Sequence, residues 1–259
     1  MAFDMKLSKF KRLVLTLKSR FLSMVNILYI FIFSRYCVYV DKRFCLAVGD
    51  SHAAIFSTNQ FLANNKDMTV FSVVVPGATA SGLDNPNSVT KAYVNFSSSV
   101  KAAPAGAYIV IQLGEVDTGY VIWWRSLKLG SCVQDMLGLA VKNYCKLISE
   151  ISVGYRPVII SAPLPTISDA LPVGEVAKKR GDISVSQRDR TDLTIVFNRK
   201  IEEFCLQKNI VFVNLDDTCL DQVTGVVRDE FIGADVLDHH YDSNAYSKIL
   251  SHALKDVLI

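Results

Sequence analysis

Short apolar runs alternate with longer segments through most of the chain after residue 43. Five runs, rich in β-branched and aromatic residues, fit buried strands over residues 44–48, 69–75, 107–113, 157–162 and 210–215. The segments between them are of helix length, and helices are expected near residues 52–65, 133–153, 187–208 and 243–258. Continuous apolar strands separated by helices are typical of a parallel sheet covered on both faces. The pattern therefore predicts a three-layer α/β/α domain with a five-stranded, mainly parallel sheet.

The first 42 residues have a different pattern and are expected to form a separate N-terminal helical segment, with the α/β domain spanning residues 43–259. Residues 6–20 (KLSKFKRLVLTLKSR) carry apolar residues at helical spacing with basic residues between them, which is typical of a helix on an anionic membrane surface. The apolar stretch that follows, residues 21–34, is long enough to span a bilayer only if it is extended to Val40 across Asn26 and Arg35. We expect this apolar and basic helix to associate with a membrane. The alternatives are a signal peptide and a helix packed on the protein's own core or on a partner chain.

A proline-, glycine- and charge-containing stretch without periodicity, residues 163–187, is expected to be a long surface loop, and such loops are often functional.

Composition narrows the possible functions. The chain of 259 residues is 50% hydrophobic and 20% charged, as expected for a globular protein, and its net charge of +3 is small. Nucleic-acid binding has little support, because the basic residues are concentrated near the N-terminus. The stretch PGATASGL lacks the spacing of a nucleotide-binding loop.

The six cysteines are far apart and include no CxxC pair, which argues against a zinc site and against a disulfide scaffold. Free cysteines favour a reducing compartment, so peripheral attachment at the cytoplasmic face of a membrane is preferred over a domain anchored outside it.

Polar turns follow the first three predicted strands. They are Gly49-Asp50-Ser51, Pro76-Gly77-Ala78-Thr79 and Gly114-Glu115-Val116-Asp117. Open parallel sheets build their sites at the carboxyl ends of the strands. Ser51 is therefore either a nucleophile on a strand-to-helix turn or only a polar cap of the next helix.

A serine nucleophile needs a histidine base, and the chain has four histidines: His52, His239, His240 and His252. His52 is adjacent to Ser51 and is a poor base for it, because neighbours on a tight turn usually point apart. His239 and His240 follow Asp238 just before the last predicted helix, whereas His252 falls within that helix.

The four blocks together resemble the SGNH (GDSL-type) hydrolase superfamily: Gly-Asp-Ser after the first strand, a glycine after the second, G-x-x-D after the third, and an Asp/His pair before the final helix. They occur in the family's order over roughly residues 44–258. The stretches LGEVD and RTDLTIVFNRKIEEFC also resemble members associated with bacterial polysaccharide or cell-surface glycan biosynthesis.

The resemblance implies a flavodoxin-like fold and a role for each matching residue. Ser51 would be the nucleophile, and its own backbone N–H and that of Gly77 would form part of the oxyanion hole. His240 would be the base, because Tyr246 follows it by six residues, and His239 is the next choice. Asp238 would orient the base, with Asp235 as the alternative.

Two positions depart from the family pattern. The family places the orienting Asp three residues before the histidine, where this chain has Leu237, and its third block carries an oxyanion-binding asparagine where this chain has Val116. Another donor could substitute for the asparagine, and the candidates are Thr118, Gln112 and Asn85.

Four further residues are candidates for binding. Gly114 and Asp117 belong to the third block, although Asp117 can equally brace the turn. Trp124 and Arg125 follow it and could line a glycan cleft, although packing is the commoner fate of tryptophan.

The sequence thus predicts a serine esterase that removes O-acyl, chiefly O-acetyl, groups from a carbohydrate and requires no metal or organic cofactor. The alternatives are an O-acyltransferase that uses the same site and a catalytically weak, membrane-associated protein that binds or assembles glycans.

Overall fold

The computed structural model describes residues 24–37, 39, 43–66, 68–169, 185–235 and 238–258. Within these residues, five parallel strands form one sheet in the order β2-β1-β3-β4-β5. The strands are β1 (Arg43–Gly49), β2 (Met68–Val74), β3 (Tyr108–Gln112), β4 (Arg156–Ile160) and β5 (Val211–Val213). The all-parallel, five-stranded sheet confirms the predicted fold class.

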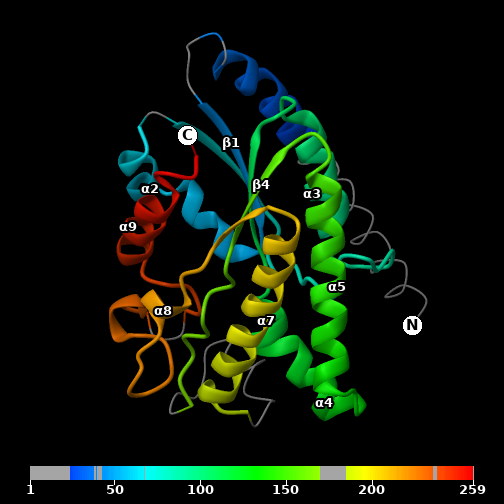
Figure 1. Cartoon of the computed structure of the whole chain (residues 1–259), viewed down its shortest axis with the longest axis vertical. Coiled ribbons are helices and arrows are strands. Elements are labelled where there is room, and N and C mark those ends of the chain that lie inside the picture. The colour runs from blue at the N-terminus through cyan, green and yellow to red at the C-terminus, as the bar shows by residue number, and fades with distance from the viewer. Residues whose placement is uncertain are drawn as a thin grey trace, which may run out of the picture.

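Helices cover both faces of the sheet (Figure 1). Helices α3 (Ala92–Ala102), α5 (Val133–Ile151) and α7 (Gln187–Gln207) lie on one face, and α2 (Asn59–Asn64), α8 (Asp216–Cys219) and α9 (Ser243–Leu254) lie on the other. The remaining helical segments are α4 (Ile122–Leu129), two 3₁₀ helices, Ser51–Ser57 and Asp229–Phe231, and a π-helical turn, Asp117–Val121.

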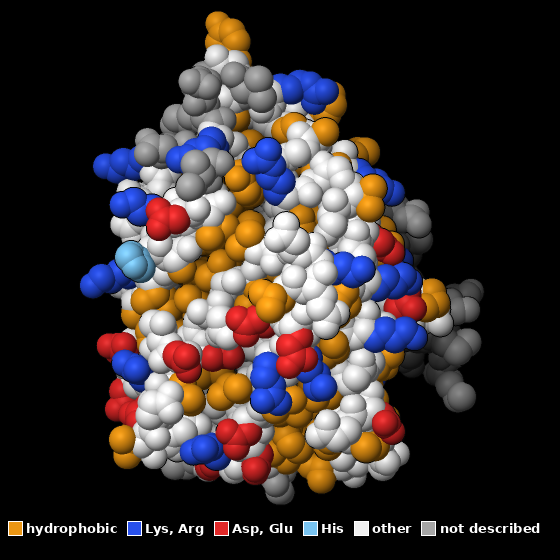
Figure 2. All heavy atoms as spheres, in the orientation of Figure 1, with side chains coloured by type: hydrophobic (Ala, Val, Ile, Leu, Met, Phe, Trp, Pro, Cys, Tyr) orange, Lys and Arg blue, Asp and Glu red, His pale blue; other side chains and the backbone are white. Residues whose placement is uncertain are grey.

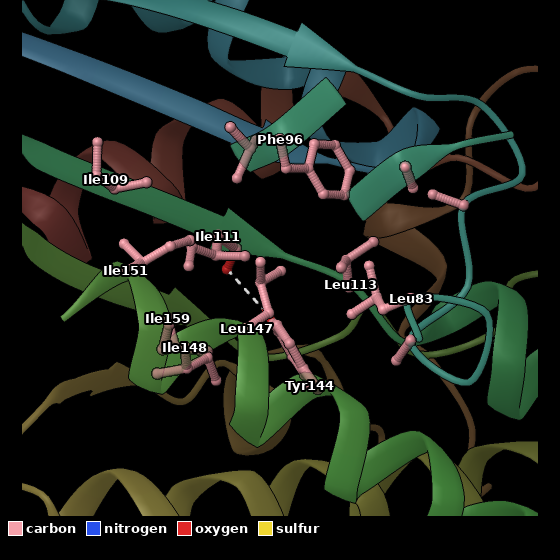
Figure 3. Packing of buried hydrophobic residues seen from close by; sticks show 14 of the residues in the cluster. Leu83, Phe96, Ile109, Ile111, Leu113, Tyr144, Leu147, Ile148, Ile151 and Ile159 are labelled. Atoms are coloured by element: carbon pink, nitrogen blue, oxygen red, sulfur yellow. Dashed lines mark hydrogen bonds between the residues drawn. The ribbon is translucent and has the colours of Figure 1, made fainter. Parts of the chain in front are cut away.

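The side chains of alternate strand residues pack into two separate hydrophobic cores, one on each face of the sheet. In β1, Leu46 and Val48 pack beneath α3, α5 and α7, whereas Cys45 and Ala47 pack beneath α2 and α9. Figure 3 shows the first core, where the Tyr144 hydroxyl donates a hydrogen bond to the Ile111 carbonyl at 3.3 Å. This bond ties α5 to the centre of the sheet and pairs a polar group that would otherwise be buried without a partner.

The predicted strands all occur, with ends within two residues of those observed. Three of the four predicted helices also occur as single helices, but the one near residues 52–65 divides at Thr58, whose side chain caps α2 by accepting from the Phe61 N–H at 3.3 Å. The sequence pattern did not predict α3, α4 or α8.

The segment expected to be a surface loop is buried where it leaves β4. Residues 162–167 are buried, and backbone carbonyl groups among them accept hydrogen bonds from side chains of α7. The Gln187 amide donates to the Pro165 carbonyl at 2.8 Å, and the Arg190 guanidinium donates to the Ile167 carbonyl at 2.7 Å. The prediction of a surface loop is therefore wrong for residues 163–167, and residues 170–184 lie outside the described residues.

An N-terminal helix over residues 24–37 packs along the first core (Figure 1). Ile30, Ser34 and Cys37 are buried, and the ring of Tyr29 lies 5.3 Å from that of Phe71 in β2. The other side of this helix exposes large apolar side chains: Met24, Val25, Leu28, Phe31, Ile32 and Tyr36. The basic stretch predicted at residues 6–20 lies outside the described residues.

Within the described part of the chain, every helix is too short or too polar to cross a bilayer. Figure 2 shows acidic and basic side chains interspersed on the face seen there, without an extended field of one sign.

Candidate active site

The turn after β1 presents Ser51 at the start of a 3₁₀ helix. Gly49 ends the strand so close to β3 that a Cβ atom there would lie 2.2 Å from the Gln112 carbonyl oxygen, which excludes any larger residue. Asp50 caps the 3₁₀ helix by accepting from the His52 N–H at 2.9 Å. Asp50 therefore performs the capping role, and the Ser51 hydroxyl is available for another function.

The histidine that faces this serine is His239. Its Nε2 atom lies 3.5 Å from Ser51 Oγ, across 188 positions of sequence. This contact is long for a hydrogen bond, as is common for catalytic pairs without bound substrate. The sequence prediction gave the role of base to His240 and named His239 as the next choice, and the structure places the second of these opposite Ser51.

Asp238 contacts both histidines that follow it. Its Oδ1 atom lies 2.5 Å from His240 Nδ1 and 3.8 Å from His239 Nδ1. The stronger contact is therefore with the histidine that does not face Ser51. Burial would raise the pKa of Asp238, but hydrogen bonds from the backbone and ring of His240 outweigh it and lower the pKa below its usual value. Asp238 is thus ionised at neutral pH.

His52 forms a second carboxylate–imidazole pair beside the first. Asp50 Oδ1 lies 3.0 Å from His52 Nδ1, and both side chains are buried. Burial would lower the pKa of His52, but the Asp50 carboxylate, with a smaller effect from Glu115, raises it above the usual value. His52 Nε2 lies 3.4 Å from the His239 carbonyl oxygen, so this pair also supports the segment that carries His239.

The two pairs share one local geometry. In each, an aspartate Oδ1 accepts from both the backbone N–H and the ring Nδ1 of the histidine two residues later. We call these segments the Asp50 turn (Asp50-Ser51-His52) and the Asp238 turn (Asp238-His239-His240). The residue between Asp and His is Ser51 in one turn and His239 in the other. The two middle residues are the ones that meet.

A cleft of about 520 Å³ opens beside this site. The cleft is lined by five residues of the two turns or next to them: Ser51, His52, Asp235, Asp238 and His240. The other lining residues come from the helical segment after Ser51, the end of β2, the segment before α9 and the start of α9: Ala54, Ile55, Thr58, Val74, Pro76, Gly233, Ala234, Tyr241, Asp242, Ser243 and Tyr246. Its volume falls in the range of small-molecule sites.

Asp117, in the polar turn after β3, holds the loop after β2 in place. Asp117 is fully buried, and its carboxylate accepts from the Ala80 N–H at 2.6 Å and the Ser81 N–H at 3.0 Å. Burial raises the pKa of Asp117 to about 6, although these hydrogen bonds oppose the shift. The bracing role weighed for Asp117 is the one the structure shows.

Gly114, predicted as a binding residue, has a packing role. Its φ angle is +128°, and a Cβ atom there would lie 2.4 Å from Cε1 of Phe197 in α7. The left-handed backbone and the close approach of α7 both require glycine at this position.

The three proposed substitutes for the oxyanion asparagine have other partners. The Thr118 hydroxyl donates to the Gly114 carbonyl at 3.1 Å, and the Gln112 amide donates to the Ser161 carbonyl at 3.2 Å. Asn85 lies in an exposed turn, where its side chain accepts from the Asn87 N–H. Val116 is half-buried and offers no donor. Gly77 is exposed next to Pro76, which lines the cleft, so its N–H stays a predicted oxyanion donor.

Trp124 and Arg125 lie on α4 and are not among the described residues that line the cleft. Their predicted place in a glycan cleft therefore has no support from this geometry.

Solved structures with the same architecture are known, although no protein-family model and no curated protein matches the sequence. A GDSL-like lipase from Bacteroides thetaiotaomicron is similar over 83% of this chain and 87% of its own, with a TM-score of 0.55 and 15% identity. A putative acylhydrolase from Bacteroides fragilis is similar over 84% and 88% of the two chains, with a TM-score of 0.52 and 12% identity. The chain has the SGNH hydrolase fold.

A third structure with this SGNH fold is an acetyl-xylooligosaccharide esterase from Geobacillus. It is similar over 83% of this chain and 94% of its own, with a TM-score of 0.51 and 13% identity.

The SGNH fold explains why the site lies at one edge of the sheet, because the polar turns after β1, β2 and β3 come together there. Sequence reasoning placed Ser51, Asp238 and both neighbouring histidines in the site. It set His52 aside as a base, and it did not recognise the Asp-x-His spacing as a signal that His52 belongs to the site.

We predict that Asp117→Ala destabilises the domain strongly. The change leaves two buried backbone N–H groups, those of Ala80 and Ser81, without acceptors, at about 1–3 kcal/mol each. Urea denaturation followed by circular dichroism measures the loss.

The matched control for this change is Asp84→Ala, in the loop that carries Ala80 and Ser81. The Asp84 carboxylate is exposed and pairs with Lys146 on the surface. Such pairs contribute little to stability, so the control unfolds at nearly the wild-type urea concentration. Equal midpoints for the two variants would contradict the bracing role of Asp117.

Proposed function

We propose that this protein is a serine acyl hydrolase that removes O-acetyl or similar acyl groups from a carbohydrate. The observation that carries the proposal is the approach of His239 Nε2 to Oγ of Ser51, a residue that lines the cleft. A serine paired with an imidazole, with a carboxylate nearby, is the arrangement that activates serine for acyl transfer.

The reaction follows from this geometry. Ser51 Oγ attacks the ester carbonyl while His239 Nε2 takes its proton, and His239 then returns the proton to the departing sugar hydroxyl. Water, activated by the same nitrogen, attacks the acyl-serine and releases the acid. Asp238, whose Oδ1 lies 3.8 Å from His239 Nδ1, stabilises the imidazolium that forms in each half-reaction.

Support for a carbohydrate substrate is of a different kind. The Geobacillus protein of the same fold is an acetyl-xylooligosaccharide esterase. The volume of the cleft beside Ser51 is sufficient for a sugar ring, and although most of the cleft surface is apolar, Asp235 and Ser243 line it and can bond to hydroxyl groups.

We predict that a fluorophosphonate probe labels the wild-type protein at Ser51. Ser51→Ala removes the nucleophile, and His239→Ala removes the base, so both variants lose the labelling. His240→Ala lowers labelling far less, because His240 does not contact the serine hydroxyl. Gel fluorescence and mass spectrometry of the labelled peptide give the measurement.

The comparison of His239→Ala with His240→Ala decides which histidine is the base, and His252→Ala, at an exposed position of α9, is the matched control. Loss of labelling in His240→Ala alone would return the assignment to His240. Folded wild-type protein that is not labelled at all would contradict the hydrolase proposal.

Val116 makes a second prediction possible. Thr118 and Gln112 donate to other groups, and Asn85 is not among the described residues that line the cleft, so an asparagine at position 116 adds the donor that the family uses. We expect Val116→Asn to raise kcat for p-nitrophenyl acetate, by up to about 10²–10³-fold, the usual effect of one oxyanion donor.

In that assay, Val116→Thr serves as the control, because threonine has nearly the same shape as valine and its hydroxyl donor reaches less far than the amide of asparagine. A Val116→Asn variant that folds normally and hydrolyses the ester no faster than wild type would show that residue 116 does not face the oxyanion.

The absence of the family's asparagine also favours the alternative function, a protein that binds or assembles glycans and hydrolyses esters weakly. An acyltransferase would use the same Ser51 and His239 with a sugar hydroxyl in place of water. Transfer of acetyl from p-nitrophenyl acetate to an oligosaccharide, detected by mass spectrometry, distinguishes transfer from hydrolysis.

We also propose that the N-terminal helix attaches the domain to an anionic membrane surface. The exposed apolar side of residues 24–37 is preceded in sequence by a stretch rich in lysine and arginine, and this combination suits an interfacial helix.

We expect the full chain to float with vesicles that contain phosphatidylserine. With vesicles of phosphatidylcholine alone, we expect it to remain in the bottom fraction of the gradient. Leu28→Asp with Ile32→Asp puts charge on the exposed apolar side and abolishes flotation. The matched control, Val223→Asp, changes a valine that is 93% exposed elsewhere on the domain and leaves flotation intact. Flotation of the double variant at the wild-type level would contradict the attachment.

A further inference from the structure

Three histidines meet at the active site although the proposed reaction uses only one as a base. The rings of His239 and His240 have centroids 4.0 Å apart, and the ring of His52 lies 4.8 Å from His240 and 5.4 Å from His239. One ring nitrogen from each of the three lies within 4.8 Å of those of the other two. Three imidazoles in this arrangement are a ligand set for a transition-metal ion.

The outer contacts of two of these rings are those of metal-binding histidines. In both Asp-x-His turns, the carboxylate bonds to ring Nδ1, at 3.0 Å in His52 and 2.5 Å in His240. A carboxylate on Nδ1 fixes the tautomer with its proton there and leaves the Nε2 lone pair for a metal. His240 Nε2 is buried and has no hydrogen-bond partner among the described residues, and the contact of His52 Nε2 with the His239 carbonyl, at 3.4 Å, is long.

We propose that His52, His239 and His240 bind a zinc-class divalent ion, and that the bound ion inhibits the serine. A tetrahedral ion with Zn–N bonds of about 2.0–2.1 Å needs ligand nitrogens roughly 3.3 Å apart, so the rings must move inward by an ångström or so. The cleft lined by Ser51, His52 and His240 is the route of entry and leaves the fourth position open.

Inhibition follows because a metal on His239 removes the capacity of this ring to act as a base. His239 Nε2 is the nitrogen that faces Ser51 Oγ, and its lone pair must be free to take the serine proton. A metal on Nε2 occupies that lone pair, and a metal on Nδ1 leaves the ring proton on Nε2, so neither arrangement allows the proton transfer. The inhibition, but not the binding of the ion, therefore rests on the proposed hydrolase function. Removal of the ion by a chelator restores the base.

The experiment uses the full chain, freed of metal with a chelator and then titrated with Co²⁺. Visible absorption reports tetrahedral cobalt, calorimetry with Zn²⁺ gives the stoichiometry, and fluorophosphonate labelling is measured on the same samples. We expect one ion per chain, visible cobalt bands, and labelling that falls as the site fills and recovers with EDTA.

Variants identify the ligands. His52→Ala and His240→Ala each weaken Co²⁺ binding by more than about tenfold, and Asp238→Asn, which removes a carboxylate behind a ligand, by about 10–100-fold. His252→Ala lies outside the cluster and binds Co²⁺ as wild type does. Because His52 is buried, His52→Gln and a circular dichroism spectrum check that lost binding is not lost folding.

The outcomes separate the two proposals. Metal-free protein that is labelled but binds neither ion, or ions that bind equally well to the histidine variants, would overturn the metal site and leave the hydrolase intact. Binding that depends on the three histidines, in a protein never labelled in any state, would support the site and overturn the hydrolase together with its inhibition.

Discussion

The parallel pairing of β1 between β2 and β3 is the constraint on which the rest of the site depends. It brings three polar turns, distant in sequence, to one edge of the sheet. Asp117 then fixes two of them together, through its bonds to the Ala80 and Ser81 N–H groups. This bracing has an electrostatic cost: because burial raises the pKa of Asp117 from 3.8 to about 6, ionisation of this group reduces the stability of the fold as the pH rises through that interval.

Negative charge surrounds the turn that carries Ser51. Asp50, Glu115 and Asp117 are buried around the carboxyl ends of β1 and β3. In the proposed reaction, an oxyanion that develops on the substrate would add a further negative charge. Burial lowers the pKa of His52, but Asp50 and, to a smaller extent, Glu115 raise it above its usual value. The proposed reaction would then depend on the backbone N–H groups of Ser51 and Gly77 to stabilise the oxyanion, without the side-chain donor that Val116 cannot supply.

The strands, the polar turns that follow them and the position of Ser51 on the first turn could be predicted from the sequence, because apolar runs and turn residues are local signals. Which of His239 and His240 faces Ser51 could not be predicted, since the segment before α9 has no periodicity and lacks the family's Asp-to-His spacing. Helix α3 was missed because its three consecutive serines weaken the apolar pattern. The burial of residues 163–167 was missed because it depends on Gln187 and Arg190 of α7, a tertiary effect without a local signal.

The two Asp-x-His turns explain why the middle residue of each turn is the one that meets the other turn. The aspartate binds the backbone and Nδ1 of the histidine two residues on, which holds that ring beside its own turn and leaves the intervening residue to face outward. Ser51 and His239 occupy these middle positions and meet. The flanking His52 and His240 also line the cleft, but the Nε2 atom of His240 is buried. The proposed glycan and the proposed ion would both occupy this cleft, so binding of one would hinder binding of the other.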